Sequence, residues 1–132
     1  MSSTAFDTRR AASGAEVIAP DGSEVRVLCA TKRGSMAQFT LPPGAVSRAV
    51  THRTIEEIWY VVRGRGRMWR RLAEQEAITL LRPGVSVSIP LGTHFQFRND
   101  GAEPLEAVGV AMPPWPGDAE ACAVAGKWPA TV

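Results

Sequence analysis

The sequence predicts an all-β sandwich or barrel. Short apolar runs that alternate with polar residues recur along most of the chain, and turns such as PPG, RGRG, RPG and NDG separate them. With 12 glycines and 10 prolines in 132 residues, turns are frequent and the segments between them are short. A chain of this length can bury a substantial core as one domain, without disulfides or a structural metal.

The strand-like segments follow one another from residue 16 to about residue 112. EVIA and EVRVL flank Pro20, Asp21 and Gly22, which predicts a hairpin. The later segments share short length and alternation, and in chain order they are SMAQFTL, VSRAVTH, EEIWYVV, RMWRRL, AITLL, VSVSIP, FQFR and LEAVGVAM. Only LAEQEA, at residues 72–77, tolerates a helix, and its place between two strand-like segments favours a hairpin loop.

The two ends of the chain lack this pattern. Residues 1–13 are small, polar and unpatterned, so we expect a flexible N-terminal arm before a barrel at residues 14–112. Residues 113–132 are too rich in Pro, Gly and Ala to predict a regular element. Trp115 and Trp128 give this C-terminal segment two large apolar anchors, so we expect it to pack on the barrel as an extended segment.

Composition excludes some classes of partner. The formal charge of +2 does not by itself indicate a nucleic-acid-binding protein. The basic run RGRGRMWRR, at residues 63–71, resembles a disordered RNA-binding segment, but a solvated hairpin with Glu74 and Glu76 as counter-charges accounts for it better. No apolar run has the length of a membrane span, and the first fourteen residues lack the hydrophobic segment of a secretion signal. We therefore expect a cytoplasmic protein that binds neither nucleic acid nor membrane.

Two spaced motifs identify a resemblance to the cupins between Gly44 and Asn99. The family positions that this chain keeps are Gly44, His52, Glu57 and Gly64 in the first motif and Gly84, Pro90, Gly92 and Asn99 in the second. The resemblance implies a single-domain cupin with a degenerate metal site, folded as a double-stranded β-helix, or jelly-roll barrel, of about 8–11 strands. Such a barrel can hold one small ligand among its inward-facing side chains.

The resemblance also implies a metal site of three histidines and one glutamate around iron, manganese, nickel or zinc. Carried over by position, the four sites hold Val50, His52, Glu57 and Phe95, so two ligands remain. Two protein ligands hold a divalent metal weakly, if at all. His94 would complete a set with His52 and Glu57 if a bulge turned it inward, although strand alternation points His94 away from the side of Phe95.

Without a metal, His52 and Glu57 form an imidazole–carboxylate pair in an apolar pocket, suited to general acid and base catalysis. Desolvation is expected to raise the pKa of Glu57, and the carboxylate to raise the pKa of His52. Alternation along the same strand directs Arg48 inward with His52, toward an internal carboxylate or toward the carboxylate or phosphate of a ligand. The predicted ligand-binding residues are Arg48, Trp59, Phe95 and Gln96.

These residues predict a small barrel that binds a small polar or anionic molecule, with possible isomerase or epimerase activity. The alternatives are a metal-dependent oxygenase that uses His52, Glu57 and His94, and a non-catalytic ligand-binding or sensory barrel. The substrate is not identified by the sequence, because this fold hosts many activities. The outer faces of the predicted sheets carry much apolar surface, at Ile58, Tyr60, Val62 and Trp69. This surface predicts a homodimer in which two sheets pack face to face.

Overall fold

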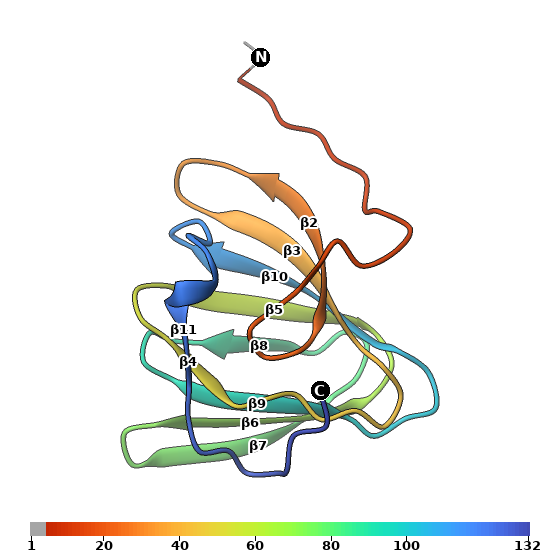
Figure 1. Cartoon of the computed structure of the whole chain (residues 1–132), viewed down its shortest axis with the longest axis vertical. Coiled ribbons are helices and arrows are strands. Elements are labelled where there is room, and N and C mark those ends of the chain that lie inside the picture. The colour runs from red at the N-terminus through yellow and green to blue at the C-terminus, as the bar shows by residue number, and fades with distance from the viewer. Residues whose placement is uncertain (1–4) are drawn as a thin grey trace.

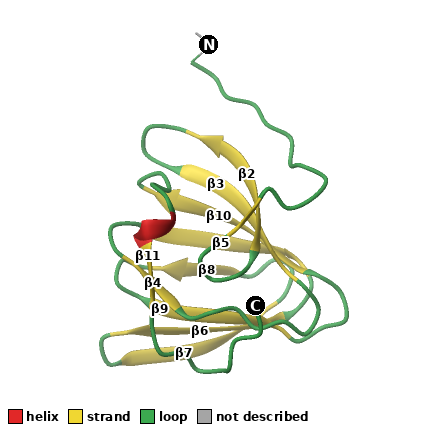
Figure 2. Ribbon diagram, in the orientation of Figure 1, coloured by secondary structure: helices red, strands yellow, loops and turns green. Residues whose placement is uncertain are grey.

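Two antiparallel sheets face each other in the computed structural model, which describes residues 5–132 (Figures 1 and 2). The six-stranded sheet has the order β1 (Val17–Ile18), β2 (Glu24–Ala30), β3 (Ser35–Leu41), β10 (Leu105–Met112), β5 (Glu56–Arg63) and β8 (Ser86–Ile89). The five-stranded sheet has the order β11 (Ala121–Ala123), β4 (Val50–His52), β9 (His94–Asn99), β6 (Gly66–Leu72) and β7 (Gln75–Leu81). The predicted all-β jelly roll is confirmed.

The predicted hairpins form where the turn residues fall. β1 pairs with β2 across the turn at Asp21 and Gly22, and Gly22 has the positive φ of 89° that such a turn requires. The segment at residues 72–77 is the end of β6, a two-residue turn and the start of β7, as predicted. In residues 72–77, strand pairing therefore outweighs the helix propensity of the sequence.

The two ends behave differently. Residues 5–16 are exposed and run away from the barrel in Figure 1, although the Arg26 Nε–H donates to the Ala12 carbonyl at 2.8 Å. Residues 113–132 return to the barrel and contain the 3₁₀ helix η1 (Asp118–Glu120) and β11, which pairs with β4. The expectation that no regular element forms there is wrong, because the free edge of β4 supplies hydrogen-bond partners. Within residues 5–132, no helix is long and apolar enough to span a membrane.

A glycine in the central strand β10 lets two aromatic rings meet inside the barrel. Trp59 on β5 and Phe39 on β3 stack with centroids 4.6 Å apart and planes 17° from parallel, although β10 lies between their strands. Gly109 is the cross-strand partner of Trp59, and a Cβ there would lie 2.7 Å from the Phe39 ring and 2.8 Å from Trp59. The absence of a side chain at Gly109 therefore sets the position of Trp59, which lines the cavity described below.

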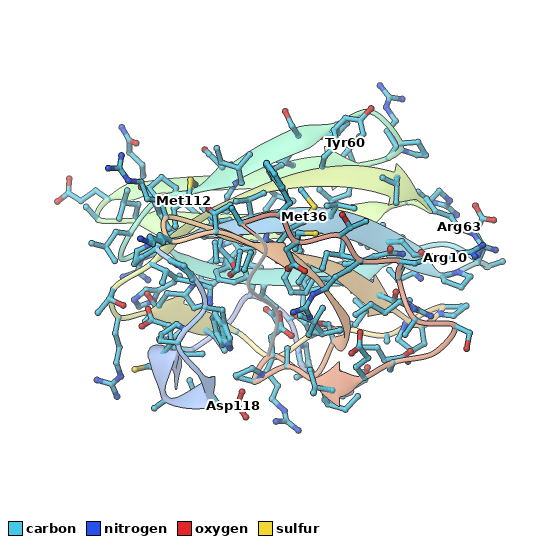
Figure 3. All side chains as sticks on the ribbon, turned by 90° about the horizontal axis from the view of Figure 1, so that it is seen from above. Arg10, Met36, Tyr60, Arg63, Met112 and Asp118 are labelled. Carbon is cyan, nitrogen blue, oxygen red and sulfur yellow. The ribbon has the colours of Figure 1, made fainter. Side chains whose placement is uncertain are left out.

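The outer face of the six-stranded sheet is apolar at the predicted positions. Ile58 and Tyr60 are each 52% exposed and Val62 is 44% exposed, and Tyr60 lies at the margin of the molecule opposite Asp118 in Figure 3. The prediction for Trp69 is wrong, because this residue lies in the other sheet and is only 4% exposed. The cross-strand partner of Trp69 is Gln96, which accepts the Trp128 N–H of the C-terminal segment. The Trp69 Nε1–H donates to Glu76 at 2.7 Å.

Candidate functional site

A cavity of about 310 Å³, partly open to solvent, lies between the two sheets. Its wall comes from β1, β2, β3, β4, β5, β9, β10 and β11, from the turn between β1 and β2, and from the segment that follows β10. Most of the wall is apolar, and its aromatic residues are Phe39, Trp59, Phe95 and Trp115. A cavity of this size and character is typical of a site for a small organic ligand.

His52 on β4 and Glu57 on β5 bring a polar pair into this apolar wall. The His52 Nδ1 atom lies 3.9 Å from the Glu57 Oε1 atom, and the two side chains are 6% and 5% exposed. That distance is too long for a hydrogen bond. The Glu57 Oε1 atom instead accepts a hydrogen bond from the Trp59 Nε1–H at 3.2 Å, while His52 Nδ1 is buried without a partner.

The surroundings of His52 favour its neutral form. Its ring packs edge-on against Phe95, with centroids 5.3 Å apart, and against Trp115, with centroids 5.4 Å apart. Burial lowers the pKa of His52 below its ordinary value of 6.5, and the charge of Glu120 opposes this only in part. The expectation of a raised His52 pKa is wrong, because desolvation by the aromatic rings outweighs the carboxylates nearby.

Burial acts in the opposite direction on Glu57. It raises the pKa of Glu57 from 4.5 to about 7, against the hydrogen bond from Trp59, and the negative charges of Asp21 and Glu120 raise it further. The His52 and Glu57 side chains are close enough for an ion pair, at 3.9 Å. Near pH 7, however, the imidazole is neutral and the carboxyl is about half protonated, so the pair is mostly neutral. Glu57 can therefore donate or accept a proton at neutral pH.

Two further carboxylates lie around the pair. Asp21 lines the cavity, and burial raises the pKa of its carboxyl despite hydrogen bonds from the Ser23 backbone N–H and hydroxyl at 2.9 and 2.7 Å. Burial acts to raise the pKa of Glu120 as well. Hydrogen bonds from the Thr54 N–H and hydroxyl, both 2.6 Å, and from the Ile55 N–H at 3.0 Å nevertheless hold the Glu120 pKa below its usual value. Glu120 is thus a fixed negative charge, whereas Glu57 is titratable.

The residues present do not fit the metal site of the resemblance. The two positions without a ligand, Val50 and Phe95, are direct cross-strand partners on β4 and β9, and their apolar side chains fill one side of the cavity wall. His94 pairs with Arg71 on β6 and does not line the cavity. In residues 5–132, no three His, Cys, Asp or Glu side chains come together as a metal-binding group. The predicted set of His52, Glu57 and His94 is therefore not assembled.

The four predicted ligand-binding residues separate into two pairs. Trp59 and Phe95 line the cavity. Arg48 is exposed outside it, and its Nε–H donates to the Val132 carbonyl at 2.9 Å. Its inward orientation was inferred from alternation, which breaks because the consecutive residues Ala49 and Val50 are both buried.

Gln96 is buried, but on the outer side of its sheet. Its Nε2 atom donates to the carbonyls of Ser47 and Trp128, both at 2.8 Å, and its Oε1 atom accepts the backbone N–H groups of Lys127 and Trp128. Gln96 therefore anchors the C-terminal segment to the barrel and has no contact with the cavity. This role is structural, not ligand-binding.

Sequence reasoning missed two parts of the site. Trp115 was expected only as an anchor of the C-terminal segment, but it lines the cavity and contacts His52. Asp21 was expected only as a turn residue, but the β1–β2 hairpin places its carboxyl in the cavity wall. Neither belongs to a motif. The sequence offered one indication for Trp115, which is a large apolar side chain in a segment composed mainly of small residues and prolines.

A jelly roll of two antiparallel sheets, with a cavity and a polar pair between them, places the fold in the class of double-stranded β-helices. The sequence profile described as "Cupin domain" matches residues 37–111, and the chain belongs to the cupin family. The chain is 30% identical over 103 residues to the uncharacterized protein MJ1618 of Methanocaldococcus jannaschii. This alignment covers 74% of this chain and 79% of that protein.

Solved structures share the fold at lower identity. A double-stranded β-helix protein from Klebsiella pneumoniae has a TM-score of 0.65 at 20% identity, over 79% of this chain and 85% of that one. Bacillus subtilis oxalate decarboxylase has a TM-score of 0.70 at 20% identity over 83% of this chain. The capsular polysaccharide assembling protein CapF from Staphylococcus aureus has a TM-score of 0.67 at 18% identity over 77%. The chain spans only 29% of that decarboxylase chain and 32% of the CapF chain.

Proposed function

We propose that the barrel binds a small, mainly apolar molecule whose one polar group enters between His52 and Glu57. The observation that carries this proposal is the His52 Nδ1 atom, which is buried in the cavity wall without a hydrogen-bond partner. A buried polar atom of this kind destabilises the free protein by about 1–3 kcal/mol. A ligand hydroxyl or carbonyl beside Glu57 would supply the missing partner while the aromatic wall holds the rest of the molecule.

The charges of the wall favour a neutral ligand. Asp21, Glu57 and Asp118 line the cavity, and no Lys or Arg does. Arg48, the cation that was expected to receive an anionic ligand, lies outside. A carboxylate or phosphate placed in this cavity would meet negative charge and lose its hydration without a compensating cation. We therefore narrow the sequence-based hypothesis of a polar or anionic ligand to a neutral one.

Calorimetric titration with phenol, toluene and benzoate tests this proposal, because the three probes share a ring and differ in polarity and charge. Phenol is expected to bind about fivefold more tightly than toluene, the effect of one neutral hydrogen bond, and benzoate is expected to bind most weakly. In the His52→Phe variant, the preference for phenol over toluene should become smaller. Tighter binding of benzoate than of phenol would contradict the proposal.

A second candidate function is proton transfer on a bound carbonyl compound. The observation that favours it is the Glu57 pKa of about 7, which provides both the acid and the base form at neutral pH. Deuterium incorporation from D₂O into the α-carbons of cyclohexanone, followed by NMR, tests it. The rate should rise with pH through about 7 and fall to the uncatalysed rate in Glu57→Gln. Equal rates with and without the protein would leave only the binding function.

A further inference from the structure

The basic segment at residues 63–71 turns one arginine into the space between the sheets. Arg70 shares the inner face of β6 with Met68, which is fully buried. Its Nη1 atom donates to the Ser88 carbonyl on β8 and its Nη2 atom to the Thr79 hydroxyl on β7, both at 2.8 Å. Arg70 therefore joins the edge strands of the two sheets, which do not pair with each other.

Arg70 lacks a carboxylate partner of the kind that Arg63 and Arg67 have. Arg63 forms ion pairs with Glu103 and Glu106, and Arg67 forms one with Asp100, but no carboxylate in residues 5–132 forms an ion pair with Arg70. The guanidinium of Arg70 is partly buried, and this burial lowers its pKa. Two of its five N–H donors are used, and its Nε–H is buried without a partner.

A second unpartnered polar atom faces the same place. Thr93, just before β9, is 2% exposed, and its Oγ1 atom has no hydrogen-bond partner. Arg70 and Thr93 both line an open cleft of about 620 Å³ with Ser88, Pro90 and residues of the β6–β7 hairpin. This cleft shares no residue with the cavity of His52 and Glu57. It is therefore a separate candidate site.

We propose that this cleft binds a small monocarboxylate, held by the Arg70 guanidinium and the Thr93 hydroxyl. A carboxylate supplies the two missing partners and the missing counter-charge at once, and a guanidinium binds it in a planar, two-pronged geometry. The bonds to Ser88 and Thr79 fix the guanidinium before the ligand arrives, so little conformational entropy is lost on binding.

The other charges of the cleft restrict the ligand to a single negative charge. Glu74 and Glu76 also line it. Glu76 accepts the Trp69 Nε1–H at 2.7 Å and lies 3.9 Å from the Lys127 Nζ atom, so its charge is partly compensated, whereas Glu74 is exposed in the turn. These carboxylates would repel a phosphate dianion more strongly than a monocarboxylate.

The test is an NMR titration of the ¹⁵N-labelled full chain with sodium acetate, with inorganic phosphate and sodium chloride at equal ionic strength as comparisons. The probes are the Arg70 Nε–H resonance, assigned by its loss in Arg70→Lys, and the Thr93 backbone N–H. Thr93→Val removes the hydroxyl without breaking any hydrogen bond in the fold, so this variant should stay folded. Arg71→Gln is the matched control, because Arg71 is exposed and outside the cleft.

Acetate is expected to shift both resonances saturably, and phosphate to shift them less. Thr93→Val should weaken acetate binding roughly tenfold, Arg70→Gln should abolish it, and Arg71→Gln should leave it unchanged. If Arg70→Gln does not fold, the wild-type titration and Thr93→Val decide the question. The proposal is overturned if acetate acts no differently from chloride, if Thr93→Val binds acetate like the wild type, or if Arg71→Gln weakens binding as much as Thr93→Val does.

Discussion

Val50 and Phe95 are direct cross-strand partners on β4 and β9. They are also the two positions at which the resemblance to metal-dependent cupins places histidine ligands. The two changes therefore lie side by side and turn one side of the site into apolar wall, against which His52 packs. Loss of one ligand would weaken a metal site, whereas here two adjacent ligand positions carry apolar side chains that line the cavity.

Restoring both positions is expected to restore metal binding. The Val50→His/Phe95→His variant would present three imidazoles and Glu57, and it should retain about one Zn²⁺ per chain after dialysis, whereas the wild type retains far less. Elemental analysis of protein purified without chelator measures this. His52→Ala in the rebuilt background is the control and should lose the metal. Stoichiometric metal in the wild type that His52→Ala removes would contradict this account.

Glu57 is expected to make the fold less stable as pH rises. Its pKa is 4.5 as an ordinary side chain and about 7 in the fold, so folding favours the protonated form. The stability from this group is complete below about pH 4.5 and is lost as pH rises through about 7, by about 3 kcal/mol in total. Denaturant unfolding at several pH values measures it.

In Glu57→Gln this part of the pH dependence should disappear, and the variant should exceed the wild type in stability above about pH 7. The exposed neighbour Glu56 provides the control, since Glu56→Gln should keep the wild-type profile. The raised pKa of Asp21 acts in the same direction in all three proteins, so some loss of stability with rising pH should remain in Glu57→Gln. Parallel profiles for wild type and Glu57→Gln would show that Glu57 titrates normally.

Gly109→Ala is expected to destabilise the fold by about 1–3 kcal/mol through overpacking. The added Cβ would lie under 3 Å from both Phe39 and Trp59 and would force their stack apart. Thermal unfolding and the near-ultraviolet circular dichroism of the tryptophans measure the two effects. Gly14→Ala is the control, because nothing lies within 4 Å of a Cβ there. An unchanged melting temperature in Gly109→Ala would refute the proposed role of this glycine.

How far the sequence predicts the molecule differs between the fold and the site. Alternation, turns and two spaced motifs were enough for the jelly roll and for the meeting of His52 and Glu57, because regular strands fix which side chains face inward. Arg48 was misplaced because it precedes the regular part of β4, where alternation does not hold. Arg70 was grouped with a solvated basic run, since charge patterns do not reveal which member of a run faces inward.

Trp115 could not be placed from sequence for a different reason. Its position depends on where the C-terminal segment crosses the barrel, and that path is set by long-range contacts such as the pairing of β11 with β4. Asp21 entered the cavity through the geometry of the β1–β2 hairpin, which brings a turn carboxyl under the sheet. Local patterns carry no information about either arrangement.

A homodimer built on the outer face of the six-stranded sheet remains our proposal for the quaternary structure. Ile58 and Tyr60 are exposed there, and their cross-strand neighbours Val110 and Val108 continue the apolar surface onto β10. Tyr60→Glu should convert a dimer to a monomer in sedimentation velocity, because a charge would be buried in the interface. Leu80→Glu, on the other sheet, should not. Dissociation by Leu80→Glu instead would place the interface elsewhere.

The most direct test of the central claim is NMR observation of the Trp59 and Trp115 indole N–H resonances while phenol is added in the presence of excess EDTA. Both indoles belong to the cavity wall, and Trp59 also donates to Glu57. If the barrel binds neutral ligands through its own His52–Glu57 pair, both resonances shift saturably and EDTA makes no difference. Shifts that appear only when a divalent metal is supplied would show that the pocket depends on a metal and would contradict the account.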